Sequence, residues 1–232
     1  MKAKYLLFSL LFLMLGTTAW ADKYYQPGSY KGNTTPRLTL EQAVGQKFMI
    51  YNTAINGNED RTGFLRNNGV QFELDKSKER DLFIYNESFV YTLEKHTDDT
   101  GTWYAIKSLS TGTYVDCKGK TTHRNAADAK LNIYNWAAAK ALGVTAWTNM
   151  ECWEYNIVAN RDIEHQSVVF VIGGKYTQNE KEFSAYWSGG TTSFGTDEWI
   201  GHPYVFYEAL EFTDESQSAV KADKPFLQDL HA

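Results

Sequence analysis

Short runs of β-branched and aromatic residues, separated by polar turns, recur along most of the chain. The first covers residues 48–51, Phe-Met-Ile-Tyr, and is followed by an Asn-Gly-Asn turn at residues 56–58. From residue 46 the apolar positions recur with a period of two, and similar runs follow about every ten residues until about residue 212. A period of two is that of a strand with one buried face. The pattern therefore predicts an all-β domain over residues 46–212.

The beginning of the chain has a different pattern. Lys2 and Lys4 precede an almost unbroken apolar run over residues 5–15, and Ala19 and Ala21 form the small-x-small pattern that signal peptidase recognises. The run is too short to span a bilayer, and no later stretch approaches that length. We therefore expect a signal peptide over residues 1–21. After cleavage near Ala21 the protein would be secreted, periplasmic or on the cell surface, without a membrane span.

Two polar segments flank the domain. Residues 22–45 are predicted to form an N-terminal arm with one short helix, which a capping box at Thr39 and Gln42 would begin and Gly45 would end. Residues 213–232 are polar and contain Lys224-Pro225, a helix-breaking pair. We expect them to form a loose tail.

The domain contains an internal repeat. Aromatic segments at residues 82–86, 131–136 and 183–187 carry tyrosines at positions 85, 134 and 186, about fifty residues apart. Two strands precede each segment, the second led by a glycine, and one aromatic strand follows it. We predict three four-stranded units, over about 46–95, 101–158 and 166–212. They would share one barrel, because closure removes exposed strand edges. The same alternation also fits an ordinary β-sandwich.

The middle unit, residues 101–158, resembles the ricin-type β-trefoil lectin domain and related secreted bacterial trefoils. Residues 103–116 look like the family's opening pair of strands, 133–136 like its third strand and 152–155 like its fourth. The resemblance covers about residues 46–212 and is strongest over 103–157. It implies a β-trefoil fold and weak binding of a glycan or polysaccharide. The chain departs from the family in lacking its glutamine-x-tryptophan signature and in carrying an insertion at residues 137–143.

The resemblance also implies a sugar site in the middle unit. The family uses an aspartate at the end of the second strand, an aromatic residue on the third and a later polar residue; here these positions are Asp116, Trp136 and Asn149. Tyr134 replaces a third-strand glutamine of the family, and Trp147 in the inserted loop would add a second wall. Asp116 also fits a turn acid without further function, and Trp136 a residue at the rim of the core.

Charge and cysteine content limit the other partners. The 23 basic and 28 acidic residues give a net charge of −5, and loss of two signal-peptide lysines leaves 21 basic against 28 acidic, or −7. No basic face is evident, so nucleic acid is not an expected partner. Cys117 and Cys152 would form a disulfide in an oxidising compartment, although two buried free thiols fit equally well. The sequence has no CxxC or HExxH motif, and we expect no metal or other cofactor.

The sequence favours binding over catalysis. It has no GxSxG motif, and its five histidines stand in unrelated contexts. A glycosidase needs two carboxylates facing each other across a cleft, and acidic pairs such as Asp197 and Glu198 more often face solvent. The main alternative is a β-trefoil that binds protein, as a surface interaction module or as a protease inhibitor presenting Arg61, Arg124 or Lys175. An accessory module to a polysaccharide-degrading enzyme is a further alternative.

Overall fold

The computed structural model describes residues 23–27, 37–52, 63–75, 85–135, 138, 167–189, 194–197 and 204–213, and these form an all-β fold. No helix within these ranges is long and apolar enough to cross a membrane. The elements in chain order are β1 (Tyr24–Pro27), α2 (Leu40–Ala43), β2 (Lys47–Asn52), β3 (Gly63–Asn67), β4 (Phe72–Leu74), η2 (Glu87–Phe89), β5 (Tyr91–Asp98), β6 (Gly101–Ser108), β7 (Tyr114–Val115), η3 (Ala126–Ala129), β8 (Asn132–Asn135), β9 (Val169–Gln178), β10 (Lys181–Gly189), β11 (Phe194–Asp197) and β12 (Tyr204–Phe212).

Six strands pair in a closed ring. β2 pairs with β5, β5 with β6, β8 with β9, β9 with β12, and β12 with β2, all antiparallel. Two backbone hydrogen bonds between Tyr104 and Leu131, of 2.9 and 2.8 Å, join β6 to the start of β8 and close the ring. Each described ring strand therefore has a ring neighbour on both sides, and such closure reduces the strand edge that is open to pairing with another chain.

Three hairpins meet at one end of this barrel. The first is β3–β4, and the third is β10–β11. The second joins β7 to residues 120–123, since the Tyr114 N–H donates to the His123 carbonyl and the Asp116 N–H to the Lys120 carbonyl. Backbone bonds from Phe72 to Gly119 and from Thr121 to Val70 join the first two hairpins. Trp187 of β10 donates its indole N–H to the Asp116 carbonyl at 3.0 Å and so ties in the third.

The barrel interior is filled by alternate residues of the ring strands. Each strand contributes side chains that are nearly or fully buried, as its period of two requires. Trp187 and Phe72 close the hairpin end, with ring centroids 5.2 Å apart. The ring-strand residues of this inner cluster, with Leu131 before β8, are Phe48, Ile50, Tyr91, Leu93, Ile106, Leu131, Ile133, Phe170, Ile172, Tyr204 and Phe206.

A second apolar cluster lies on the outside of the barrel, over β2, β9 and β12. These strands are apolar on both faces, and β1 and the segment around η2 contribute Tyr25, Tyr85 and Phe89 to the cluster. Tyr25 is fully buried, and β1 pairs antiparallel with the end of β12. The other buried members of this outer apolar cluster are Met49, Tyr51, Phe64, Val90, Val169, Val171, Val205, Tyr207 and Ala209.

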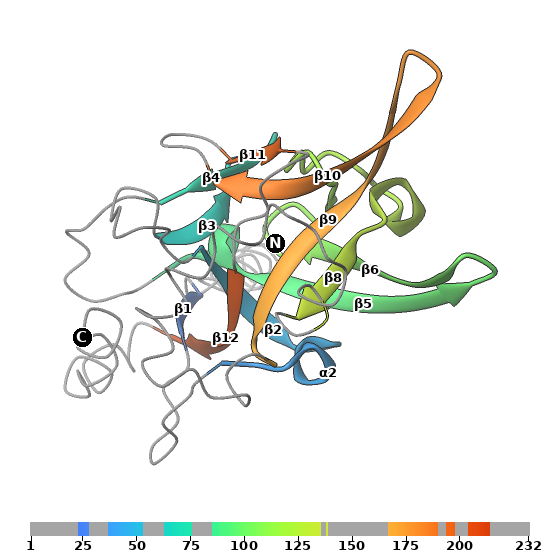
Figure 1. Ribbon diagram of the computed structural model, residues 1–232. Helices are drawn as coiled ribbons and strands as arrows, with labels where there is room; N and C mark the ends of the chain where they lie inside the picture. Colours follow the sequence, from blue (N-terminus) through green and yellow to red (C-terminus); the bar gives the residue numbers. More distant parts are fainter. Residues whose placement is uncertain are drawn as a thin grey trace, which may run out of the picture.

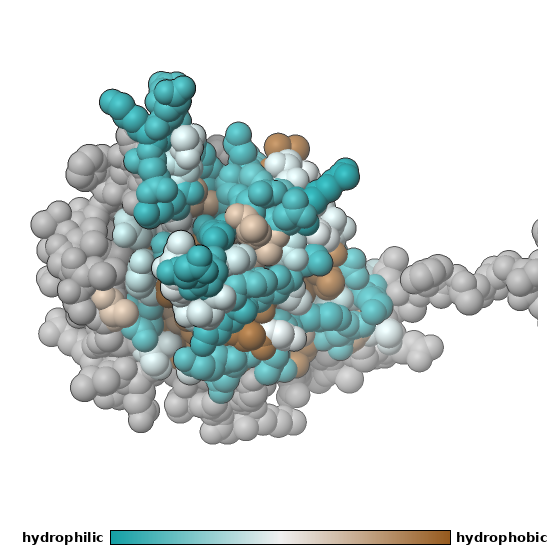
Figure 2. All heavy atoms as spheres, turned by 90° about the vertical axis from the view of Figure 1, so that its right-hand side faces the viewer, coloured by the Kyte–Doolittle hydropathy of each residue, from teal (hydrophilic) through white to brown (hydrophobic). Residues whose placement is uncertain are grey.

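Two hairpins project from the barrel body. β5–β6 and β9–β10 extend away from it on the right of Figure 1. The β9–β10 hairpin turns at Asn179 and Glu180, whose φ angles of 50° and 62° suit a two-residue type I′ turn. The side from which the hairpins project is mainly hydrophilic (Figure 2).

The structure corrects the strand assignment inside the predicted repeat. In the first predicted unit, β4 at residues 72–74 follows β3, and of the segment 82–86 only Tyr85 and Asn86 are described; Tyr85 forms an isolated bridge to Tyr25. The segment around Tyr134 is the ring strand β8, and Tyr186 lies on β10, one strand earlier than expected. The aromatic segments around Tyr134 and Tyr186 therefore occupy different places in their two predicted units. Aromatic alternation marks any strand with a packed face, so it could not separate ring strands from hairpin strands.

Several predicted features fall outside the described residues. They include the signal peptide at residues 1–21, the tail beyond Thr213, the expected strand at 153–157, and the insertion at 137–143 apart from Ala138.

The capping box at Thr39 is present: its hydroxyl accepts the Gln42 N–H, and the Gln42 side chain accepts the Thr39 N–H.

Candidate functional site

Asp116 lies directly after β7, in the turn that leads to residues 120–123. Its Oδ1 accepts the backbone N–H groups of Lys118 and Lys120, at 2.8 and 2.9 Å. Its Oδ2 lies 3.0 Å from Nε2 of His123, and its side chain is 17% exposed. Gly119 allows the tight turn with a φ of 71°. The turn therefore holds one carboxylate in a fixed position at the surface, beside an imidazole that is 29% exposed.

The thiol next to Asp116 points into the barrel. Cys117 is buried, and its Sγ lies 3.6 Å from the Lys175 carbonyl oxygen. Burial, with the nearby Asp116 charge, raises its pKa to about 11. A methyl group added at Gly174 would lie 2.8 Å from the Cys117 Cβ, so β9 passes directly over this residue. Cys152 lies outside the described residues, and its pairing with Cys117 stays a prediction.

The other predicted sugar-site residues are not brought to Asp116 by the part of the chain that the structure describes. Trp136, Trp147 and Asn149 lie outside that part. Tyr134 on β8 is half-buried and packs against the outer apolar cluster. Asn135, the residue before Trp136, pairs with Phe170, four residues from Gly174 on β9. At about 3.3 Å per residue, that is about 13 Å along the strand from the level of Cys117.

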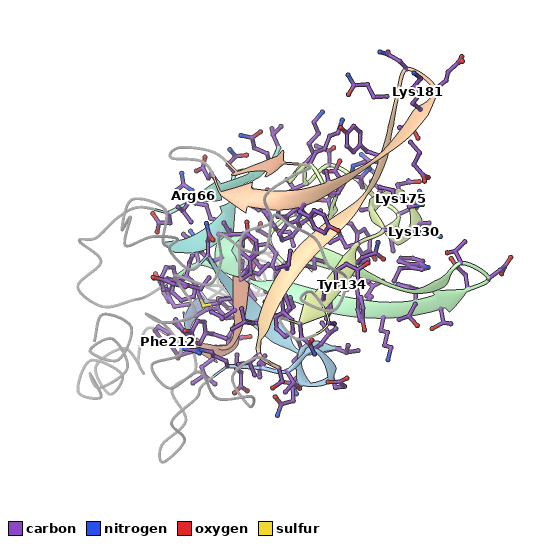
Figure 3. All side chains as sticks on the ribbon, viewed as in Figure 1. Arg66, Lys130, Tyr134, Lys175, Lys181 and Phe212 are labelled. Carbon is purple, nitrogen blue, oxygen red and sulfur yellow. The ribbon has the colours of Figure 1, made fainter. Side chains whose placement is uncertain are left out.

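A set of polar and aromatic side chains covers the outside of β5 and β6, and its centre is Trp103. The His96 ring from β5 stacks on the indole with ring centroids 4.2 Å apart and planes 13° apart. The Lys130 ammonium lies 4.8 Å from the indole centroid. Asp98 accepts the indole N–H at 2.8 Å and pairs with Lys130 at 2.7 Å. Lys130, two residues before β8, is labelled in Figure 3.

Hydrogen bonds connect this set to the Asp116 turn. Glu94 of β5 accepts the Tyr114 hydroxyl at 2.8 Å and lies 3.0 Å from Nε2 of His96. Tyr114 belongs to β7, two residues before Asp116, and Lys107 lies 5.3 Å from its ring centroid. We call this surface the polar outer face; its members are Glu94, His96, Asp98, Trp103, Lys107, Tyr114, Asp116, His123 and Lys130.

Most of the polar outer face was missed by sequence reasoning, although a signal exists. Glu94, His96 and Asp98 alternate along β5, and the two-residue turn at 99–100 sets them opposite β6. His96 is thus directly opposite Trp103. A prediction of a β-hairpin over residues 91–108 would therefore have paired the two side chains. By contrast, the bond from Trp187 to Asp116 joins residues 71 positions apart, and no local pattern points to it.

The chemistry of this face is that of a fixed set of hydrogen-bonding groups. Each carboxylate is paired with a cation or a histidine, and the Lys130 and Thr100 hydrogen bonds hold the pKa of Asp98 well below its usual range. Among the described residues no group of three His, Cys, Asp or Glu side chains could hold a metal ion. The face therefore offers carboxylate acceptors and cationic donors, whereas its central indole is already in contact with His96 and Lys130.

Comparison with known proteins gave no relative. No known family's model matches the chain, and no curated protein and no solved structure matches it significantly.

Proposed function

We propose that the protein is an exported, non-catalytic β-trefoil module that binds carbohydrate through the middle unit. The order of strand pairing supports the trefoil. Within each unit a first and a last strand pair, as β2–β5, β6–β8 and β9–β12. Between units β5–β6, β8–β9 and β12–β2 pair, which closes the ring. One hairpin per unit lies between its first and last strand, so the three units repeat the same connectivity.

The Asp116 carboxylate is the observation that carries the proposed sugar site. Two backbone N–H groups and His123 fix its position at the end of the second strand, and part of it faces solvent. A fixed acceptor loses little conformational freedom on binding, which favours affinity for a small polar ligand. Ionised carboxylates make strong hydrogen bonds to hydroxyl groups. The stacking partner under this proposal is Trp136 or Trp147.

The absence of catalysis is supported by the charge state of the face. A glycosidase acid must hold a proton near neutral pH, which requires a raised carboxyl pKa. The pKa of Asp98 is instead lowered, chiefly by its hydrogen bond with Lys130. Glu94 and Asp116 each pair with a histidine. Asp98 is therefore placed to accept hydrogen bonds from a ligand rather than to donate a proton to it.

Export is supported by where the fold begins. Tyr24 opens β1 three residues after Ala21, the predicted cleavage position, and Tyr25 is fully buried in the outer apolar cluster. The described part of the fold thus begins two residues after the predicted cleavage position. Removal of residues 1–21 would leave every described contact intact.

A glycan microarray probed with residues 22–232 tests the proposal. Asp116→Asn keeps one oxygen for the two turn N–H groups but removes the charge, so it separates binding from folding. Glu180→Gln, at the exposed tip of the β9–β10 hairpin, is the matched carboxyl-to-amide control. We expect the wild type and Glu180→Gln to bind the same glycans. Asp116→Asn, and the double variant Trp136→Ala/Trp147→Ala, should each lose about tenfold or more in affinity. A folded wild type that binds no glycan contradicts the proposal.

The projecting β9–β10 hairpin favours protein binding as a second candidate function. Residues 177–182 at its tip are all exposed, and the Lys175–Glu182 ion pair of 2.6 Å braces its strands. Of the residues expected to serve an inhibitor, Arg61 lies outside the described residues and Lys175 is engaged with Glu182, whereas Arg124 is exposed. Inhibition of trypsin by the wild type, lost in Arg124→Ala, would support this function. Unchanged trypsin activity would count against the inhibitor form.

A further inference from the structure

We infer that the carbohydrate recognised by the middle unit is acidic, carrying carboxylate or sulfate groups; this rests on the function proposed above. The observation is the charge distribution around Asp116. Residues 116–131 carry Lys118, Lys120, Arg124 and Lys130 against the two acids Asp116 and Asp128. The whole chain, by contrast, has more acidic than basic residues, 28 against 23. The turn is thus a cationic region on an acidic protein.

Most of the neighbouring carboxylates already have partners of their own. Asp98 pairs with Lys130, and Asp116 uses Oδ1 for two backbone N–H groups and Oδ2 for His123. On the adjoining hairpin, Glu73 is paired with Arg66. Within the described part of the chain, no carboxylate pairs with Lys118, Lys120 or Arg124. A ligand at this turn therefore meets three cations that no described carboxylate pairs with.

The geometry of these cations favours an extended ligand. Along residues 120–124, the exposed Lys120, Thr122 and Arg124 alternate with the buried Thr121 and the half-buried His123. The alternation favours one common side for the exposed residues, with Lys120 and Arg124 four positions apart in the chain. Lys118 is held by a cation–π contact, 3.7 Å from the centroid of the Tyr176 ring. Successive acidic groups of one saccharide chain could reach these cations in turn.

The chemistry of the donors sharpens the ligand class. Hydrogen bonds between cations and anions are about twice as strong as neutral ones, and arginine binds carboxylate or sulfate-like groups in a bidentate manner. Neutral hydroxyls would leave most of this advantage unused. At physiological salt, charges more than about 8 Å away are largely screened, so the local cations outweigh the net negative charge of the rest of the protein.

Binding to matched polysaccharide pairs tests the inference. Polygalacturonate is compared with its methyl ester and dextran sulfate with dextran, using residues 22–232 and single-stranded polyuridylate as the polyanion control. Lys120→Gln/Arg124→Gln is compared with Lys95→Gln/Lys181→Gln, which removes two exposed charges elsewhere. We expect binding to at least one acidic polymer, at least about tenfold weaker binding to its neutral form, and about a tenfold loss in the first double variant only. Binding should also weaken as salt rises.

The outcomes distinguish a failure of the acidic-ligand inference from a failure of the proposed carbohydrate binding. Equal binding to acidic and neutral forms, or equal losses in the two double variants, overturns the acidic-ligand inference and leaves the proposed function standing. Polyuridylate bound as tightly as the polysaccharides overturns it too, since the surface would then be a general polyanion site. Binding to no saccharide, on these polymers or on the array, removes the proposed function and the inference with it.

Discussion

The outer face of β5 and β6 and the outer face of β2, β9 and β12 belong to one barrel but differ in chemistry. On β5 and β6 the outward positions carry charged and aromatic groups, such as His96, Asp98 and Trp103, that hydrogen-bond or stack with one another. On β2 and β12 they carry Met49 and Tyr207, buried under other parts of the chain. The inward positions of both sets are alike, since both fill the same inner cluster.

The two faces differ in how far their side chains reach solvent. The apolar outer face is covered by β1 and the segment around η2, so its side chains are buried and contribute to stability. Most side chains of the polar outer face are exposed or half-buried, and the side from which the two hairpins project is mainly hydrophilic (Figure 2). Substitutions should therefore affect mainly stability on the first face and mainly binding on the second.

The largest expected effect is that of Tyr25→Ala on the apolar side. Tyr25 is fully buried among Tyr85, Phe89 and Tyr207, and its loss leaves a cavity under β1. Removing a buried aromatic side chain costs about 3–5 kcal/mol of unfolding free energy. Urea denaturation followed by tryptophan fluorescence measures it. A loss below about 1 kcal/mol would mean that β1 adds little to the core and that the apolar outer face is not mainly structural.

Trp103→Ala is the matched aromatic deletion on the polar outer face. Trp103 is half-buried and loses the His96 stack, which is worth about 0.5–1.5 kcal/mol beyond the buried area. We expect a total loss of about 2 kcal/mol, clearly below that of Tyr25→Ala, by the same urea measurement. A cost as large as that of Tyr25→Ala would show that this face is structural as well.

Two substitutions of Asp116 test how its side chain stabilises the turn within the polar outer face. Asp116→Ala removes the acceptor of two turn N–H groups and should cost about 1 kcal/mol, as the loss of a capping side chain does. Asp116→Asn keeps an acceptor oxygen and should cost less. Thermal unfolding of the two variants side by side gives the difference. Equal losses would mean that the carboxylate does not hold the turn through these bonds.

The smallest expected effect is a pH dependence at the edge of the apolar face. Hydrogen bonds from Lys23 and then Lys47 lower the pKa of Glu211 from 4.5 to about 2. Because its folded-state pKa lies below the ordinary value, Glu211 stabilises the fold above about pH 4.5, and this contribution is lost as the pH falls toward 2. The group is one-third exposed, so we expect less than about 1 kcal/mol. Glu211→Gln should flatten the unfolding free energy between pH 4.5 and 2; an unchanged slope would speak against the assignment.

The all-β class could be predicted from the sequence because strand periodicity is local. The run at residues 48–51 alternates inward Phe48 and Ile50 with outward Met49 and Tyr51, and it became β2. Strand order is not local. β8 became a ring strand because Tyr104 and Val171, far from it in sequence, pair with its ends. The alternation around Tyr134 is the same whichever partner it finds, so the sequence could not place it.

The contacts of the candidate site also include local ones, which the sequence predicts, and long-range ones, which it does not. Asp116 was proposed through a family resemblance, and its hydrogen bonds to Lys118 and Lys120 follow from the short turn between them. Its link to Trp187 depends on how two hairpins meet at the end of the barrel. Such contacts follow from the packing of whole units, which residue spacing along the chain does not encode.

Hydrogen–deuterium exchange of residues 22–232, with and without the saccharide that binds best, tests whether the ligand binds at the Asp116 turn. We expect the ligand to protect amides of residues 113–124 and to leave those of β12 unchanged. Protection confined to the tip of the β9–β10 hairpin, or to β12 and β1, would contradict it.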